Sequence, residues 1–405
     1  MSPVLTALFN TAEIVSLSIV CLILCYLLIL TALAARARLR TGFSTLVQRR
    51  FAVVVPAHNE ELEIGRTVKS IRDTGYPRER FDTIVIADNC TDETASRAAA
   101  AGATVLERSD PALRGKGHAL RWGFDRLLGG ETPYDAVVVI DADSVISANY
   151  LAVLNWYLEQ GVQVIQSSDL VEPGNDAWNA QMTRIGFLLY NYVRPLGRKA
   201  IGGTAGLRGT GMCFAAGVLR AFPWNAYSIT EDIEYGLHLL LCGIKVTFAP
   251  EATVLAVMPR DARNAEGQRA RWEGGRLGLI RRYSLPLLAK VMRSRSLAFL
   301  DAFFDLTVPA LVNLIGLVLL AALLSFSLTL FDVNGAGTYG MLWLAAAALG
   351  FIHLIAGLRI APADRSLYLA LLQLPRYALW KAAVYARMPG SWSKNVWLRT
   401  TRETR

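Results

Sequence analysis

The chain has 405 residues, of which 53% are hydrophobic and 19% charged, with a formal net charge of +9. This hydrophobic content is high for a soluble protein, and it is concentrated in a few blocks. Most of the excess positive charge flanks those blocks, which favours attraction to anionic lipid over binding to nucleic acid. The composition therefore predicts a membrane-associated protein and argues against a nucleic-acid-binding one.

The first apolar block, residues 14–35, contains no charged residue and is long enough to cross a bilayer of about 30 Å. A cleaved signal peptide is the competing interpretation. It fits poorly, because the block is too long and is preceded by Glu13 rather than by basic residues. We expect a transmembrane helix here, with residues 1–13 as an extracytoplasmic N-terminus.

Residues 36–300 are predicted to lie in the cytoplasm. Two further apolar blocks, at residues 304–331 and 339–358, predict two more transmembrane helices. Basic residues follow the first block, precede the second and follow the third, whereas the 332–338 loop has none. By the positive-inside rule, we expect a multi-pass protein of the plasma (inner) membrane with a large cytoplasmic domain.

The C-terminal segment is ambiguous. Residues 366–388 are largely apolar but contain Pro375, Arg376 and Lys381. We interpret the segment as an amphipathic helix on the cytoplasmic surface, followed by a basic cytoplasmic tail at residues 389–405. A fourth span is the alternative, and it would place the tail outside.

Between residues 50 and 275, short apolar strands alternate with helical segments. The expected strands cover residues 51–56, 82–88, 103–107 and 134–143, and the helices between them cover residues 60–74, 91–102 and 116–128. Such alternation predicts an α/β domain with a doubly wound, mostly parallel sheet.

Polar residues follow three of these strands, at residues 56–61, 88–92 and 141–143. Ligands of doubly wound sheets bind beyond the carboxyl ends of the strands, so we expect a site where the three clusters meet. No dinucleotide fingerprint or P-loop is present. The stretch Arg114-Gly-Lys-Gly117 suits a phosphate, although an ordinary loop with a solvated Lys116 would have the same sequence.

Two carboxylates one residue apart, Asp141 and Asp143, end the fourth strand and point the same way on an extended chain. This arrangement suits Mg²⁺ or Mn²⁺ shared with a diphosphate. A polar turn is the plainer interpretation of an isolated D-A-D. The cysteines and histidines show no spacing typical of a metal site.

Two later stretches support a catalytic interpretation. Thr230-Glu-Asp232 opens an apolar helix. In one interpretation these residues only cap the helix and interact with its dipole. In the other, Asp232 acts as a general base. Gln268-Arg-Ala-Arg-Trp272 can be a surface helix with a buried tryptophan. Alternatively, its arginine and indole could close over a sugar diphosphate.

The ordered motifs P-A-x-N-E, D-N-x-T-D-x-T, G-K-G, D-A-D, T-E-D and Q-x-x-R-W resemble those of inverting family 2 glycosyltransferases with a GT-A fold. The resemblance is greatest to the membrane-integrated branch that contains cellulose, chitin and hyaluronan synthases and bacterial ceramide glucosyltransferases. It covers about residues 50–285, with the catalytic domain at 50–275.

The resemblance implies a role for each matching position. The nucleotide-sugar donor would be bound by Pro56, Ala57, Glu60, Asp88, Lys116, Asp141, Gln268, Arg271 and Trp272. The acceptor would contact Gly211, Met212, Cys213, Glu231 and Trp272. Asp141 and Asp143 would hold the metal ion, Asp232 would be the catalytic base, and residues 276–300 would form an interfacial helix.

The implied reaction moves a sugar, with inversion, from a nucleotide sugar to a lipid-linked or glycan acceptor, as in glycolipid or cell-envelope glycan synthesis. Uracil is the base that the resemblance implies. Three predicted spans are fewer than polymer synthases place around a channel, which favours adding one sugar or a few. The Q-x-x-R-W motif is typical of processive members. A processive β-polysaccharide synthase, with a pore formed by oligomers or partners, therefore stays as the alternative.

Two other classes could share parts of the pattern. A nucleotidyltransferase could have the same sheet and aspartate pair, but it would release pyrophosphate and has no need of T-E-D and Q-x-x-R-W. A catalytically inactive glycan-binding subunit would lack the base or the metal ligands, whereas Asp141, Asp143 and Asp232 are all present.

Overall fold

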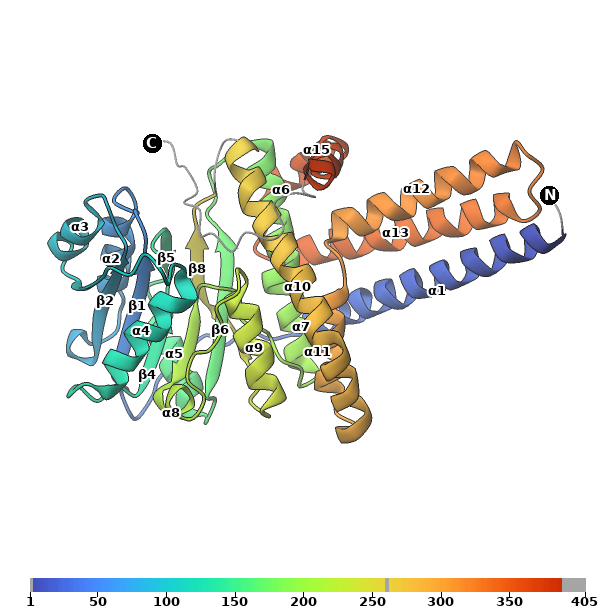
Figure 1. Cartoon of the computed structure of the whole chain (residues 1–405). Helices are drawn as coiled ribbons and strands as arrows, with labels where there is room; N and C mark the ends of the chain where they lie inside the picture. Colours follow the sequence, from blue (N-terminus) through green and yellow to red (C-terminus); the bar gives the residue numbers. More distant parts are fainter. Residues whose placement is uncertain (1–2, 259–261, 388–405) are drawn as a thin grey trace.

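The computed structural model describes residues 3–258 and 262–387. It contains an α/β domain and, projecting from one side of it, three long helices that lie together (Figure 1). We refer to these three helices as the three-helix bundle; they are α1 (Pro3–Ala34), α12 (Leu311–Thr329) and α13 (Ala336–Ile360). All three are long and apolar enough to cross a membrane.

The α/β domain is built on an eight-stranded sheet of order β3-β2-β1-β4-β7-β6-β8-β5. The strands are β1 (Phe51–Ala57), β2 (Phe81–Asp88), β3 (Thr104–Arg108), β4 (Ala136–Val139), β5 (Ser144–Ile146), β6 (Val164–Val171), β7 (Met212–Ala215) and β8 (Thr247–Ala256). Strands β3, β2, β1 and β4 are parallel, as is the β6–β8 pair. Strand β7 is antiparallel to both neighbours, and β5 is antiparallel to β8. The expected α/β fold with a mostly parallel sheet is confirmed.

Helices cover both faces of the sheet and enclose a separate core on each. They are α2 (Ile64–Arg72), α3 (Thr94–Ala100), α4 (Lys116–Gly129), α5 (Tyr150–Glu159), α6 (Trp178–Phe187), α7 (Arg194–Ala200), α8 (Ala216–Ala221) and α9 (Glu231–Leu241). Successive residues of β1 alternate between the cores: Val54 packs in one, and Val53 and Val55 pack in the other. Burial on both faces explains why the strands are continuous apolar runs in the sequence.

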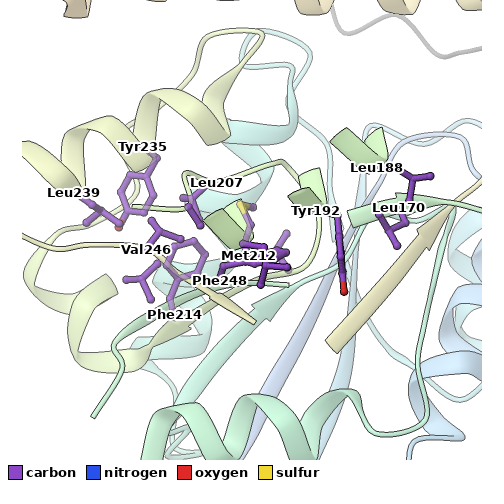
Figure 2. Packing of buried hydrophobic residues seen from close by; sticks show 14 of the residues in the cluster. Leu170, Leu188, Tyr192, Leu207, Met212, Phe214, Tyr235, Leu239, Val246 and Phe248 are labelled. Atoms are coloured by element: carbon purple, nitrogen blue, oxygen red, sulfur yellow. The ribbon is translucent and has the colours of Figure 1, made fainter. Parts of the chain in front are cut away.

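The core that faces the three-helix bundle is rich in aromatic side chains (Figure 2). Phe214 of β7 lies edge-on to Tyr235 of α9, with ring centroids 5.8 Å apart. Phe248 of β8 lies in the same way against Tyr192, which belongs to the π-helical turn η2 (Leu188–Val193) between α6 and α7. This core also contains Leu354 of α13, so it joins the sheet to the bundle.

The N-terminal helix begins earlier than expected. Residues 1–13 were expected to precede the span, but α1 starts at Pro3 and Glu13 lies within it. The Glu13 carboxylate accepts hydrogen bonds from Ser325 Oγ of α12 (2.9 Å) and Trp343 Nε1 of α13 (2.7 Å). One acidic side chain therefore contacts all three helices of the bundle.

The expected span at residues 304–331 is divided into two helices. Helix α11 (Leu297–Thr307) ends before Pro309, and α12 begins at Leu311. Proline lacks the N–H that a helix interior needs, and its ring clashes with the preceding turn. The candidate span is therefore limited to Leu311–Thr329, whereas the third one, α13, extends slightly beyond the expected residues 339–358.

The expected interfacial helix at residues 276–300 is not a separate element. Its first part continues α10 (Ala262–Ser294), the same helix that carries Gln268–Trp272, and its last residues begin α11. Leu279, Tyr283 and Leu287 of α10 are buried against α9 and α11. One face of this segment thus packs on protein, and the prediction that the segment lies at a membrane surface stays untested.

The C-terminal segment consists of α14 (Arg365–Ala370), a 3₁₀ turn η3 (Leu371–Gln373) and α15 (Leu374–Arg387). Within the described residues this segment is not among the candidate spans, so the fourth-span alternative gains no support. Helix α15 packs on α10 through an ion pair between Lys381 and Glu273 (2.8 Å). The expected basic tail at residues 389–405 lies outside the described residues.

Helix α7 of the α/β domain packs on α1 of the bundle almost backbone to backbone. A Cβ atom at Gly197 would lie 2.2 Å from the carbonyl oxygen of Leu30, so no side chain fits there.

We expect Gly197→Ala to lower stability by roughly 1–3 kcal/mol, seen as a lower thermal midpoint of the protein in detergent. The matched control is Gly217→Ala in α8, where nothing lies within 4 Å of the new methyl group. It should leave the midpoint unchanged or slightly raised. Equal midpoints for the two variants would contradict the close packing.

Candidate active site

A cavity of about 460 Å³ opens at the carboxyl ends of β1 and β4 and reaches the first residues of α12. Its lining residues come mostly from parts of the α/β domain that are far apart in the sequence, from Pro56 to Arg276. Ten of the predicted site residues are among them: Pro56, Glu60, Lys116, Asp141, Asp143, Glu231, Asp232, Gln268, Arg271 and Trp272. The sequence motifs that are far apart along the chain therefore do meet in one place.

Lys116 lies at the centre of the charged end of the cavity. It is the first residue of α4, and its ammonium group donates to Asp141 Oδ1 (2.5 Å) and to the carbonyl oxygen of Gly209 (2.7 Å). Glu231 Oε1 lies 3.9 Å away. Burial alone would lower the pKa of Lys116, but attraction to these carboxylates has the larger effect and the pKa is raised. The lysine is therefore a permanent cation that can face a phosphate.

The aspartate pair lies in the turn after β4, and the Asp141 side chain is 37% exposed. Within the described residues, no three Asp, Glu, His or Cys side chains are grouped closely enough to hold a metal ion by themselves. Mg²⁺ in proteins commonly has only one or two carboxylate ligands, with substrate phosphates and water completing the shell. Asp141 and Asp143 fit a metal ion of that kind.

A further carboxylate in the cavity, Asp169, was missed from the sequence. Asp169 of β6 is 4% exposed; its Oδ2 accepts from Asn191 Nδ2 (2.9 Å), and its Oδ1 has no partner among the described residues. Burial, together with the charges of Asp141 and Asp143, raises the pKa of this carboxyl group. The available signal was the run of four polar residues, Gln166-Ser-Ser-Asp169, inside a strand whose neighbours are apolar.

The predicted base stands at the N-terminus of α9, where the helix dipole favours a negative charge. Asp232 is half-buried beside Gly209: a Cβ there would lie 3.5 Å from Asp232 Oδ2 and 3.7 Å from Lys116 Nζ. Burial raises the pKa of Asp232, opposed by the backbone N–H of Ile233 and by Lys116. Burial likewise raises the pKa of the adjacent Glu231. A carboxylate with a raised pKa is a better proton acceptor.

Helix α10 closes another side of the cavity with Gln268, Arg271 and Trp272. The Trp272 ring lies 5.8 Å from that of Phe187, and the guanidinium of Arg269 lies 5.7 Å above the Trp272 ring. Arg271 is half-buried; burial lowers its pKa, whereas the charge of Glu231 raises it. The helix thus brings an indole and cations to the same cavity as the carboxylates.

The structure does not bring every predicted donor residue into the cavity. Ala57 is wholly buried at the end of β1 and is absent from the lining. Asp88 is 1% exposed, and its Oδ1 accepts from Arg108 Nη1 (2.5 Å) in a buried ion pair. Their proposed contact with a nucleoside is not supported by this geometry, because both side chains are used in packing or pairing within the domain.

Most of the predicted acceptor residues likewise lie outside the cavity lining. Met212 and Cys213 begin β7, and their side chains have no exposed surface. Strand β7 lies between β4 and β6 in the middle of the sheet, so both of its faces are covered. Gly211 is also outside the lining, whereas Gly209 and Thr210 are part of it. The part of the loop available to a substrate ends where the strand begins.

The far end of the cavity was not foreseen. Its lining includes Tyr190, Arg194, Arg208, Arg276, Leu311 and His353. Arg208 donates to Tyr190 Oη (2.8 Å) and to Asp305 Oδ2 (3.0 Å). Leu311 and His353 belong to α12 and α13, so the cavity connects the carboxylates with the three-helix bundle.

Residues 48–275 match the family model described as "Glycosyltransferase like family 2". A probable glycosyltransferase of Bacillus subtilis, YdaM, is 26% identical over 268 residues, which are 63% of this chain and 61% of the relative. A beta-monoglucosyldiacylglycerol synthase of a Nostoc species is 27% identical over 233 residues, which are 53% of this chain and 48% of the relative. The chain thus spans between about half and three fifths of the length of these relatives.

The solved structure of a mannosyltransferase from Pyrobaculum calidifontis, in complex with GDP-Man and Mn²⁺, superposes with a TM-score of 0.54. The match covers 85% of this chain and 98% of the mannosyltransferase at 16% sequence identity, which shows a shared fold. The family match covers more than half of the chain and contains the lysine, the aspartate pair and Asp232. The chain belongs to glycosyltransferase family 2 and has a GT-A fold.

Proposed function

We propose that the protein transfers a sugar, with inversion, from a nucleotide sugar to a lipid acceptor at a membrane surface. The observation that carries this proposal is the continuity of one cavity. It joins the charged groups Lys116, Asp141 and Asp232 to Leu311, the first residue of a helix able to cross a membrane. A donor can enter at the end that holds Lys116 and the carboxylates, and an acceptor at the end beside α12 and α13.

The donor end suits a nucleoside diphosphate sugar. Pro56 near the end of β1 and Glu60 after it line the cavity and are proposed to contact the nucleoside, while Lys116 and Arg271 supply cations for the diphosphate. Trp272 offers an apolar ring face to a sugar. A UDP-sugar is the proposed donor, on the resemblance of the motifs.

Asp141 and Asp143 are proposed to hold Mg²⁺ or Mn²⁺, which would offset the negative charge on the departing diphosphate. The mannosyltransferase that shares the fold was solved with Mn²⁺, which supports a divalent ion in a general way. Asp169, buried beside the pair with a free oxygen, is a further proposed contributor.

The proposed mechanism is a single displacement. Asp232 accepts the proton of an acceptor hydroxyl while that oxygen attacks the anomeric carbon, and the bond to the nucleoside diphosphate breaks. Lys116 and Arg271 stabilise the charge on the leaving group. One in-line step inverts the anomeric configuration, so an α-linked donor gives a β-linked product, with no covalent intermediate.

We propose that the three-helix bundle lies in the inner membrane and the α/β domain in the cytoplasm. The bundle contains the three candidate spans, and one relative is named as a synthase of a glucosylated diacylglycerol. The arginines between the spans and the domain support a cytoplasmic domain.

The proposal is tested with protein in nanodiscs, Mn²⁺, a panel of UDP- and GDP-sugars, and candidate lipid acceptors. We expect nucleoside diphosphate release from one donor that depends on the lipid, and a product one sugar longer. A long product ladder without added acceptor would establish the processive alternative instead. Release of pyrophosphate, or no release with any donor, would overturn glycosyl transfer.

Metal dependence gives a separate prediction. Chelation by EDTA, or the variant Asp143→Asn, is expected to lower the rate of diphosphate release at least 100-fold, because a metal ion at a phosphate contributes several kcal/mol. The affinity of UDP, measured by calorimetry, should rise with Mn²⁺ in the wild type but not in Asp143→Asn. Asp73→Asn, at an exposed aspartate after α2, is the control and should respond to Mn²⁺ as the wild type does. Full activity in EDTA would contradict the metal assignment.

A further inference from the structure

We propose that the acceptor lipid carries a phosphate group and that Arg194 binds it. This inference rests on the proposed function, since it names the chemical class of the acceptor for the same cavity. The observation behind it is a buried guanidinium at the bundle end of the cavity that, among the described residues, makes no ion pair of the kind made by Arg198 and Arg208.

Three arginines line this end, namely Arg194 of α7, Arg208 before β7 and Arg276 of α10, and Arg198 of α7 lies behind them outside the lining. Two carboxylates of α11 face them. Arg198 pairs with Asp301 (2.9 Å) and Asp305 (2.6 Å), and Arg208 pairs with Asp305 (3.0 Å). Arg276 donates to the carbonyl oxygens of Leu306 (2.9 Å) and Asp305 (3.1 Å).

Arg194 is the exception. Its side chain is 3% exposed and lines the cavity, yet among the described residues its Nε and Nη1 have no hydrogen-bond partner. It lies beside the ring of Tyr190, 5.1 Å from the centroid, which satisfies none of its donors. The charge of Asp305 favours the cation from further away, but two buried donors without a hydrogen-bond partner are unfavourable. An anion that binds in the cavity would remove this cost.

The surroundings of Arg194 indicate what kind of molecule brings the anion. Leu189, Ala310 and Leu311 add apolar surface beside the arginines of this end, and α7 packs directly on α1. Cations for the diphosphate of a donor are already present on other elements, Lys116 on α4 and Arg271 on α10. The geometry therefore favours an amphiphile whose phosphate meets Arg194 and whose chains leave along the bundle.

The base adds a further requirement. Asp232 needs a hydroxyl to deprotonate, so the phosphate is a point of attachment rather than the attacking group. A phosphodiester lipid with a hydroxyl on its headgroup meets both conditions. Phosphatidylglycerol has both features, whereas a diacylglycerol has the hydroxyl alone, and the two can be compared with identical chains.

The experiment measures the thermal midpoint of the purified full chain in detergent with dioctanoyl phosphatidylglycerol, dioctanoylglycerol or inorganic phosphate. We expect only the first to raise the midpoint of the wild type. In Arg194→Gln this lipid should bind about tenfold more weakly or worse, since charge-assisted hydrogen bonds are lost. The lipid-free midpoint of this variant should be unchanged or higher, because a buried charge that makes no ion pair among the described residues is gone. A merely structural arginine would behave in the opposite way.

Two matched variants complete the design. Arg293→Gln, at an exposed position of α10, should keep the full response to the lipid. Arg198→Gln removes an arginine that is fully paired, so its lipid-free midpoint should fall. Calorimetry with UDP should give the same Kd for Arg194→Gln and the wild type.

Several results would overturn the inference. Equal stabilisation by both lipids would show that the phosphate is not recognised, and equal stabilisation by inorganic phosphate would assign Arg194 to a free anion. A weaker Kd for UDP in Arg194→Gln would assign it to the donor. These binding results do not depend on sugar transfer. Absence of diphosphate release from every donor would instead overturn the proposed function and leave them standing.

Discussion

Asp232→Asn is expected to lower kcat about 1,000-fold, within the range of roughly 10²–10⁴ that a positioned base contributes. The amide has the size of the carboxylate but cannot accept the proton of an acceptor hydroxyl. It stays at the N-terminus of α9, facing Gly209 and Lys116, so the shape of the cavity is preserved. The rate of nucleoside diphosphate release gives kcat, and calorimetry with UDP should give a Kd close to that of the wild type.

The matched control for this prediction is Asp125→Asn. Asp125 is an aspartate of α4 whose side chain is 56% exposed and pairs only with Arg121 of the same helix. It should leave both constants unchanged. If Asp232→Asn kept its kcat and lost only donor affinity, Asp232 would be a binding residue, and the adjacent Glu231 would become the candidate base.

Asp305→Asn is expected to lower the free energy of unfolding by about 3–5 kcal/mol, the usual cost of removing one partner from a buried ion pair. The carboxylate is the shared partner of Arg198, which is 1% exposed, and of Arg208. Burial opposes its ionisation, but the arginines prevail and hold the pKa of Asp305 below its usual range. The loss of stability is measured as the difference between the thermal unfolding midpoints of the variant and the wild type in detergent.

The same pair predicts a dependence on pH. Because the folded pKa is below the unfolded value of about 3.9, the ionised Asp305 stabilises the fold at every pH above that value. This contribution disappears as pH falls through the folded pKa, so the variant and the wild type should converge only in strong acid. As a control, Asp364→Asn breaks an ion pair with Arg184 in which Asp364 is 45% exposed, and should cost no more than about 1 kcal/mol. Similar losses for both variants would contradict the role assigned to Asp305.

The sheet and the charged end of the cavity could be predicted because their signals are local. Strands that are buried on both faces are apolar runs, as in β1, and parallel strands place their carboxyl ends on one edge. Lys116 lies in the segment after β3, and Asp141 and Asp143 lie in the turn after β4, so all three meet at that edge. Pro309 was a local signal as well, and it marks the division of the block at residues 304–331 into α11 and α12.

The other end of the cavity depends on contacts between distant parts of the chain. Nothing near Arg194 in the sequence distinguishes it from Arg198. Within residues 3–258 and 262–387, however, Nε and Nη1 of Arg194 have no hydrogen-bond partner, whereas Arg198 pairs with two carboxylates of α11. Met212 and Cys213 follow a glycine-rich motif that suits a loop, but strand pairing with β4 and β6 buries them. In both cases the contacts are made by residues far away in the sequence. The local pattern of hydrophobic residues does not indicate which distant residues these are.

Glu13 has a consequence for how the chain is made. Its hydrogen-bond partners, Ser325 and Trp343, follow it by 312 and 330 residues. At about 5–20 residues per second, the ribosome needs roughly 16–66 s to reach them. During that interval a carboxylate in the first apolar helix has neither partner, and hydrocarbon strongly disfavours it in that state. We therefore expect α1 to reach its final position in the proposed membrane only after α12 and α13 have been synthesised. The last helices of the chain would then determine where the first one lies.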